Sequence, residues 1–116
     1  MKTSPLPTGL GAISDPVVIS AIEALQGRDS KRWFGLFAEK PAFSDDGLPR
    51  DLRKWCEEEF FGSFRAHLIS IDKVESGGLT FFAMYHSDKW GDFKTFWRFV
   101  VNDGKISKLD VGATDY

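Results

Sequence analysis

The chain has 116 residues, of which 15 are basic and 17 acidic, so its formal net charge is −2. This length is typical of one domain with one core, and the charge balance lacks the excess of basic residues that general nucleic-acid binding requires. No apolar run approaches the roughly 20 residues that span a bilayer. We therefore expect a single domain that binds neither nucleic acid nor a membrane.

The sequence carries no signal for a disulfide, a metal or a cofactor. Cys56 is the only cysteine, so an internal disulfide is excluded and no second thiol stands at zinc-ligand spacing. Neither a glycine-rich phosphate loop nor a metal-ligand motif is present, and the segment from Met1 to Pro7 lacks the apolar stretch of a secretory signal. We expect no cofactor, no metal site and a reducing, cytoplasmic location.

Two segments can be distinguished at the start of the chain. Residues 1–13 contain two prolines and two glycines without apolar periodicity, which predicts a flexible N-terminal arm before a single domain over residues 14–116. Asp15 followed by Pro16 is typical of a helix start. Because apolar residues then recur at helical spacing up to Gly27, we predict a first helix over about residues 16–26.

Two further helices are predicted before the spacing of apolar residues changes from that of helices to that of strands. Asp29 or Ser30 can cap the second helix, whose apolar stripe continues until Pro41 ends it. A short extended piece and a turn-forming stretch, residues 44–49, follow it. The third helix is expected over about residues 50–61, with Leu52, Trp55, Cys56 and Phe60 on one face. Its acidic run Glu57-Glu58-Glu59 is interpreted as a solvated flank.

The second half of the chain has the alternation of β-strands. Four strands are predicted, over about residues 64–75, 79–87, 93–102 and 105–112, with turn residues between them. Such short connections require antiparallel neighbours. The expected fold class is therefore α+β, with three N-terminal helices packed in a curved antiparallel four-stranded sheet.

Both faces of the third predicted strand carry large apolar groups. Thr95, Trp97 and Phe99 point one way, while Phe96 and Val100 point the other way. A sheet with one solvated face would alternate more cleanly. We expect the helices to cover one face and a second copy of the chain to cover the other, which makes a homodimer.

The order of these elements, together with several short motifs, resembles a known superfamily. Residues 24–29 and 36–40 are similar to the stretches around its second helix, and Trp97-Arg98-Phe99 followed by Asp103-Gly104-Lys105-Ile106 is similar to its penultimate strand and closing hairpin. The chain thus resembles, over residues 16–113, the nuclear-transport-factor-like superfamily. That superfamily includes ketosteroid isomerase, scytalone dehydratase and SnoaL-like cyclases, and its fold is a cone-shaped α+β roll.

The resemblance to ketosteroid isomerase implies a catalytic candidate. Asp45 falls on the position of that enzyme's general base, where a carboxylate at the mouth of an apolar cavity moves a proton between carbons. The positions of its two oxyanion donors correspond to Ala21 and Thr95, which argues against efficient steroid isomerisation. Asp45 also stands in an Asp-Asp-Gly stretch that is typical of an ordinary turn, so both interpretations stay open.

Other candidates have a structural and a functional interpretation. Tyr85 and His86 are neighbours on a predicted strand, so one of them faces the cavity and can serve as acid or base, depending on the hairpin register. His67 is interpreted as a sheet or interface residue. Asp110 either faces the cavity or pairs with Arg98 or another basic neighbour on the outer face, and the ion pair is favoured. The candidates for core or cavity wall are Trp33, Phe37, Phe43, Trp55, Phe60, Thr95, Trp97 and Phe99.

Two functions are consistent with these patterns. The first is binding of a small, largely apolar organic molecule, with cofactor-free proton transfer of the isomerase, dehydratase or cyclase kind. The second is a non-catalytic dimeric binding or accessory protein of the same fold.

Overall fold

The computed structural model describes residues 3–116, which form three helices and a six-stranded sheet. The helices are α1 (Pro16–Gln26), α2 (Ser30–Gly35) and α3 (Leu52–Glu59). The strands are β1 (Phe37–Asp45), β2 (Leu48–Pro49), β3 (His67–Glu75), β4 (Thr80–Ser87), β5 (Gly91–Asn102) and β6 (Lys105–Ala113). Short 3-10 turns occupy Leu10–Ala12 and Ser76–Gly78. Within residues 3–116, no helix is long and apolar enough to cross a membrane.

Each helix begins at a capping aspartate, as the sequence predicts for the first two. Asp15 accepts hydrogen bonds from the amides of Val17 and Val18, at 2.9 and 3.1 Å. Asp29 and Asp51 accept in the same way from residues three positions later. These bonds satisfy amides that have no partner inside the helix, so the local sequence sets where each helix starts.

The second helix is shorter than the sequence pattern predicts. It ends at Gly35, and the segment expected to continue it to residue 40 forms β1 instead. β1 pairs in parallel with β6, and the amide of Ile106 donates to the carbonyl of Leu36 at 2.8 Å. Pro41 lies where the register between the two strands shifts, so its missing N–H costs no ladder bond. Pairing with a distant strand therefore overrides the helical periodicity.

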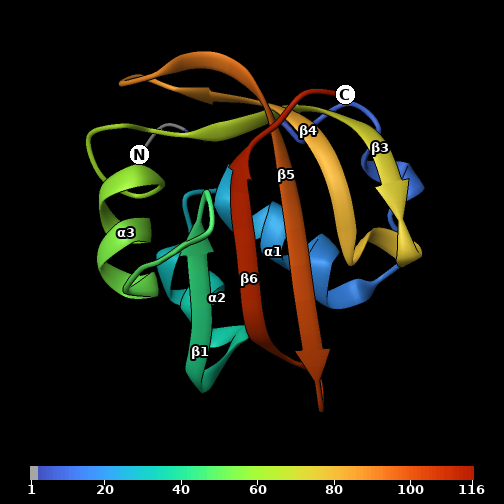
Figure 1. The fold of residues 1–116 in the computed structure, drawn as a ribbon, viewed down its shortest axis with the longest axis vertical. Coiled ribbons are helices and arrows are strands. Elements are labelled where there is room, and N and C mark those ends of the chain that lie inside the picture. The colour runs from blue at the N-terminus through green and yellow to red at the C-terminus, as the bar shows by residue number, and fades with distance from the viewer. Residues whose placement is uncertain (1–2) are drawn as a thin grey trace.

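The sheet has two more strands than predicted, and it is mixed. Its order is β2-β1-β6-β5-β4-β3, and the four strands predicted from the sequence are antiparallel neighbours, as expected. The expectation of a four-stranded sheet is wrong because β1 extends it beyond β6 and β2 pairs with β1. Figure 1 shows the strands side by side with α1 and α2 behind them and α3 beyond the β1 side.

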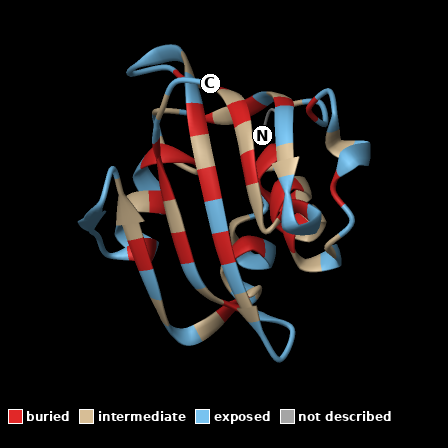
Figure 2. Ribbon diagram, turned by 45° about the vertical axis from the view of Figure 1, so that its right-hand side comes forward, coloured by how far each residue is buried: buried red, intermediate tan, exposed pale blue. Residues whose placement is uncertain are grey.

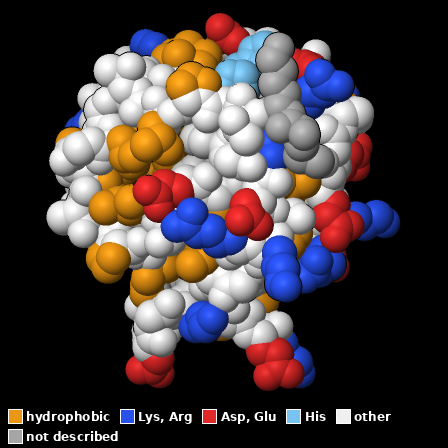
Figure 3. Space-filling model, turned by 180° about the vertical axis from the view of Figure 1, so that it is seen from behind, with side chains coloured by type: hydrophobic (Ala, Val, Ile, Leu, Met, Phe, Trp, Pro, Cys, Tyr) orange, Lys and Arg blue, Asp and Glu red, His pale blue; other side chains and the backbone are white. Residues whose placement is uncertain are grey.

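The core lies between the helices and one face of the sheet. Along β5, Thr95, Trp97 and Phe99 are buried while Phe96 and Val100 are more exposed, and Figure 2 shows this alternation. Stacked or edge-to-face rings join the layers, with Phe60 centred 5.9 Å from Trp97. The outer surface of the molecule on the side of the helices, seen from behind in Figure 3, carries side chains of both charges. The inner and outer faces of β5 are those predicted from the sequence.

The described part of the N-terminal arm, residues 3–13, runs along β3 and α1. Thr8 forms a parallel bridge with Ser70, and its carbonyl accepts from the amide of Ile71 at 2.7 Å. The side chain of Gln26 donates to the carbonyl of Pro5 at 2.6 Å and also bonds the backbone of β3. Ile13 is buried. The first two residues of the predicted arm lie outside the described part of the chain.

Candidate functional site

A cavity of about 750 Å³ opens between α3 and the inner face of the sheet, at the end where β4 turns into β5. Its apolar walls come from both layers: Trp55 on α3, Tyr85 on β4, and Phe93 and Trp97 on β5. Phe64, before β3, and Trp90, in the β4–β5 turn, stand at the same cavity. Trp90 is 62% exposed, so an aromatic ring stands at the opening.

Four acidic residues line this cavity, Asp45, Asp46, Glu58 and Glu59, and burial affects two of them most, Asp45 and Glu59. Asp45 ends β1, and Glu59 ends α3. Burial raises the pKa of Asp45 above its ordinary value, and the neighbouring charge of Asp46 raises it further, while a hydrogen bond from Trp55 lowers it. The cavity thus holds carboxyl groups that ionise less readily than carboxyls in water.

Glu59 is the more deeply enclosed of the two. It is 6% exposed and accepts a hydrogen bond from the hydroxyl of Tyr85 at 2.7 Å. Burial raises the pKa of Glu59, hydrogen bonds from Tyr85 and Ser87 lower it, and the charge of Asp45 raises it again. Tyr85 is held in the neutral form, because burial and the adjacent Glu59 raise its pKa. The Tyr85–Glu59 pair therefore joins the sheet to α3 at the floor of the cavity.

Cations balance these acids near the opening. Arg50 lies before α3, and Lys89 lies in the β4–β5 turn. Each lowers the pKa of one cavity acid through its charge, Arg50 that of Asp45 and Lys89 that of Glu59. The site thus combines aromatic walls, a partly buried Asp45, a buried Glu59, and cations that are exposed to solvent.

The two neighbouring aspartates of the turn have different surroundings. Asp46 accepts a hydrogen bond from the amide of Ala113 at 2.8 Å and so holds the end of β6. It has a positive φ of 51°, as a tight turn before Gly47 requires. Asp45 contacts Trp55 instead. The turn chemistry expected from the Asp-Asp-Gly stretch thus belongs mainly to Asp46.

The register of β4 decides between the two neighbouring acid–base candidates. Tyr85 points inward and lines the cavity, whereas His86 points to the outer face. His86 lies 2.8 Å from Asp88 and 2.6 Å from Asp92, and hydrogen bonds to these carboxylates raise its pKa. The imidazole of His86 therefore makes its hydrogen bonds outside the cavity.

Some of the remaining predicted site residues line the cavity, and the others lie in the hydrophobic core. Trp55, Thr95 and Trp97 line the cavity. The others are buried outside this lining, in the core between helices and sheet: Trp33, Phe37, Phe43, Phe60 and Phe99. The single hydroxyl proton of Thr95 is already used, because the hydroxyl donates to the carbonyl of Ala83 at 2.9 Å; it also accepts from the indole N–H of Trp97 at 2.9 Å.

Glu59 is the buried acid of the site that the sequence analysis missed, and other lining residues were not predicted either, among them Arg50, Phe64, Lys89, Trp90 and Phe93. The interpretation of Glu59 as part of a solvated flank is wrong, although Glu57 and Glu58 are exposed as expected. The signal that identifies Glu59 is its spacing, seven residues after Leu52 and three after Cys56, both buried on the same helix face. Asp110 lies on the outer face as predicted, 3.7 Å from Lys108. Within residues 3–116, no cluster of side chains could hold a metal ion.

Comparison with known proteins confirms the fold. No family model and no curated protein matches the sequence. The chain is similar to the Orange Carotenoid Protein of Anabaena in complex with canthaxanthin, with a TM-score of 0.67 and 16% identity, covering 96% of this chain and 41% of that one. It is also similar to a nuclear-transport-factor-like protein of Cytophaga hutchinsonii, with a TM-score of 0.66, 15% identity and coverage of 98% and 95%.

A third similar structure comes from Sinorhizobium meliloti and is named among the polyketide cyclases. Its TM-score is 0.64 at 15% identity, with coverage of 84% of this chain and 94% of that one. The fold of this chain is therefore that of the nuclear-transport-factor-like superfamily, as its sequence motifs predict.

Proposed function

We propose that this protein binds a small, largely apolar organic molecule in the cavity between α3 and the sheet. The observation that carries the proposal is the composition of that cavity: a space of about 750 Å³ walled by aromatic rings, with Asp45 and Glu59 in its lining. Ligand sites in proteins have this size and this mixture of apolar wall and few polar groups. Similar structures include an Orange Carotenoid Protein binding canthaxanthin and a computationally designed 17-OHP binder.

The acids give the ligand a preferred chemistry. A molecule with an apolar body and one carbonyl or hydroxyl group matches a site that is apolar on the walls and hydrogen-bonding at the floor. Asp45 is the proposed general base for proton transfer at a carbon next to that carbonyl, because its partly buried carboxylate has a raised pKa. The protonated form of Glu59, favoured by burial, is the proposed hydrogen-bond donor to the developing oxyanion.

A non-catalytic role is the second candidate, and a specific observation favours it. The hydroxyl of Thr95 is engaged by Ala83 and Trp97, and Ala21 is buried in α1 without a donor. The two positions that correspond to oxyanion donors in ketosteroid isomerase thus offer none to a ligand. Loss of one such donor typically costs about two to three orders of magnitude in turnover, so binding without turnover follows if Glu59 does not replace them.

Ligand binding is tested with a panel of hydrophobic ketones and lactones in a thermal-shift assay. The matched variants are Val111→Phe, which fills the cavity, and Val100→Phe, which adds the same ring on the outer face. A panel member at 100 times its Kd raises the free energy of unfolding by about 2.7 kcal/mol. We expect this stabilisation in the wild type and Val100→Phe, and none in Val111→Phe. Equal stabilisation of both variants would refute binding in this cavity.

Turnover is tested separately with the two adjacent aspartates. Asp45→Asn removes the proposed base, whereas Asp46→Asn keeps an oxygen acceptor for the Ala113 amide. We expect proton exchange at the carbon next to the carbonyl of a bound ketone, followed by NMR in D₂O, to stop in Asp45→Asn and to persist in Asp46→Asn. Exchange at the wild-type rate in Asp45→Asn would leave ligand binding as the function.

We also propose a homodimer through the outer face of the sheet. Phe82, Met84 and Phe96 are only half-buried there, and Val100 and Ile69 are exposed by 45% and 39%. Size-exclusion chromatography with light scattering should give twice the mass of 13.1 kDa, and Val100→Glu should give the monomer. A monomeric wild type would refute this pairing. The cytoplasmic location expected from the sequence stays a prediction.

A further inference from the structure

A second cavity, of about 760 Å³, lies where β3 begins, and it shares no lining residue with the first. Its lining combines the N-terminal segment, the connection after α1 and the loop after α3. The basic residues of its lining are Arg28, Arg65 and His67, and the lining also contains the hydroxyl groups of Ser4 and Ser63. Because apolar groups dominate the first cavity and polar groups this one, the two are suited to different ligands.

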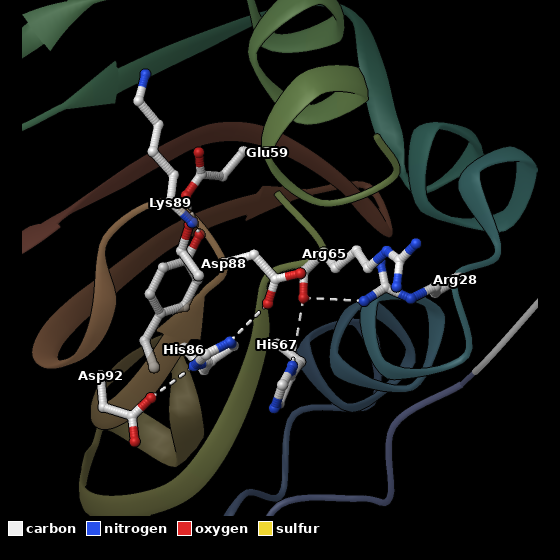
Figure 4. Close-up of polar contacts among 10 residues, drawn as sticks. Arg28, Glu59, Arg65, His67, His86, Asp88, Lys89 and Asp92 are labelled. Atoms are coloured by element: carbon white, nitrogen blue, oxygen red, sulfur yellow. Dashed lines mark hydrogen bonds and ion pairs between the residues drawn. The ribbon is translucent and has the colours of Figure 1, made fainter. Parts of the chain in front are cut away.

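The two arginines are brought together by an unusual backbone. Arg28 and Arg65 have φ angles of 53° and 49°, in the left-handed region that favours glycine. Residues other than glycine in such conformations cluster at functional sites. Both side chains line this cavity, and Figure 4 shows them near each other. Arginine therefore stands at two strained positions where its guanidinium reaches the same space.

The guanidinium of Arg28 is oriented by neutral acceptors. It donates to the carbonyl of Phe60 at 2.6 Å and to the carbonyl of Arg65 at 2.9 Å. Burial lowers the pKa of Arg28 and the like charge of Arg65 lowers it further, while the charge of Asp88 raises it, so Asp88 offsets part of the repulsion between the two cations. Within residues 3–116, the guanidinium of Arg65 makes no hydrogen bond or ion pair. An anion between the two side chains would relieve this repulsion.

Asp88 is the acidic residue of the lining, and its carboxylate already has a partner in His86. Its carboxylate lies 2.8 Å from His86, which is also 2.6 Å from Asp92, and its amide donates to the carbonyl of Phe64 at 2.7 Å. The ring of His67 lies 5.0 Å from that of His86, and Figure 3 shows the histidines at the surface. The lining thus has two arginines against one carboxylate, and that carboxylate is shared with His86.

We propose that this second cavity binds the phosphate group of a small molecule, held by Arg65 and Arg28 with His67 at its edge. Guanidinium groups present several donors in a planar fork that matches the oxygens of phosphate. Phosphate carries three such oxygens and up to two charges, which suits a pair of adjacent cations. The hydroxyls of Ser4 and Ser63 add donors for the remaining oxygen atoms.

Inorganic phosphate is the first probe, and calorimetric titration of the full chain at constant ionic strength is the assay. Arg65→Gln removes the guanidinium, and the matched control Arg98→Gln removes an arginine that packs over Phe96 on the outer face. Arg65→Gly is the second variant, because glycine adopts the positive φ without strain and preserves the fold. We expect saturable binding to the wild type and Arg98→Gln, and at least tenfold weaker binding to both Arg65 variants.

Two further titrations test the position of the binding site and the chemical class of its ligand. Asp88→Asn removes the competing carboxylate, so phosphate should bind several-fold more tightly. Titration with glycerol phosphate, compared with inorganic phosphate, shows whether the site prefers a phosphate ester or the free ion. Saturable binding of either compound supports the site, and the tighter of the two identifies the preferred class. Absence of saturable binding by both, or equal binding to wild type, Arg65→Gln and Arg65→Gly, would overturn the proposal. Ketone binding in the first cavity is unaffected by these results.

Discussion

Removing the hydroxyl of Tyr85 should destabilise the protein in a pH-dependent way. Tyr85→Phe keeps the ring in place but leaves the carboxyl of Glu59 without the donor that now lies 2.7 Å away. Both residues are buried, at 4% and 6% exposure, so water does not readily replace the lost bond. A hydrogen bond to a charged group contributes about 1.5–3 kcal/mol. We therefore expect the free energy of unfolding to fall by about 2 kcal/mol at a pH where Glu59 is ionised, which is about 8 °C in Tm for a chain of this size.

The sign of the pH dependence follows from the raised pKa of Glu59. Since burial raises this pKa in the folded state, the ionised form is present only above it, and the folded state gains stability as the pH falls through it. Tyr85→Phe removes a bond that lowers the pKa of Glu59, so it raises that pKa further. The loss of stability should therefore be largest at high pH and shrink to about 1 kcal/mol once Glu59 is protonated.

Urea unfolding followed by tryptophan fluorescence measures this effect at each pH. Glu59→Gln and the double variant complete a double-mutant cycle, which isolates the Tyr85–Glu59 coupling. We expect a coupling of about 1 kcal/mol or more at high pH. A Tyr85→Phe protein as stable as the wild type at every pH, or a cycle without coupling, would refute the assignment of this pair.

Three further results are expected. Thr95→Val leaves the indole N–H of Trp97 without its acceptor inside the core, so urea unfolding should show a loss of about 2 kcal/mol; full wild-type stability would contradict that bond. Asp46→Ala removes the acceptor of the Ala113 amide, and hydrogen exchange at that amide should become faster, whereas unchanged protection would disprove the contact. In an NMR titration, His86 should lose its proton at a pH above the ordinary 6.5, because two carboxylates raise its pKa; the stability it contributes is present at low pH and lost as the pH rises through that pKa. A midpoint at or below 6.5 would contradict the pair of carboxylate contacts.

The sequence by itself determined the elements whose signals are local. Asp15 caps the first helix because its carboxylate reaches amides two and three residues away. The strands from β3 to β6 follow each other through short turns, so their antiparallel order needs no knowledge of distant contacts. The alternation along β5 likewise assigned Trp97 to the inner face and Phe96 to the outer face.

Only the tertiary structure decided the features that depend on residues far apart in the chain. β1 is a strand because β6, more than sixty residues later, offers it a parallel partner that no local periodicity indicates. Glu59 belongs to the cavity because Tyr85 arrives from the sheet to bond it, and a run of three glutamates alone does not distinguish its members. Tyr85 rather than His86 faces the cavity because a regular β4–β5 register fixes which side of the strand points inward, and a one-residue shift would reverse it.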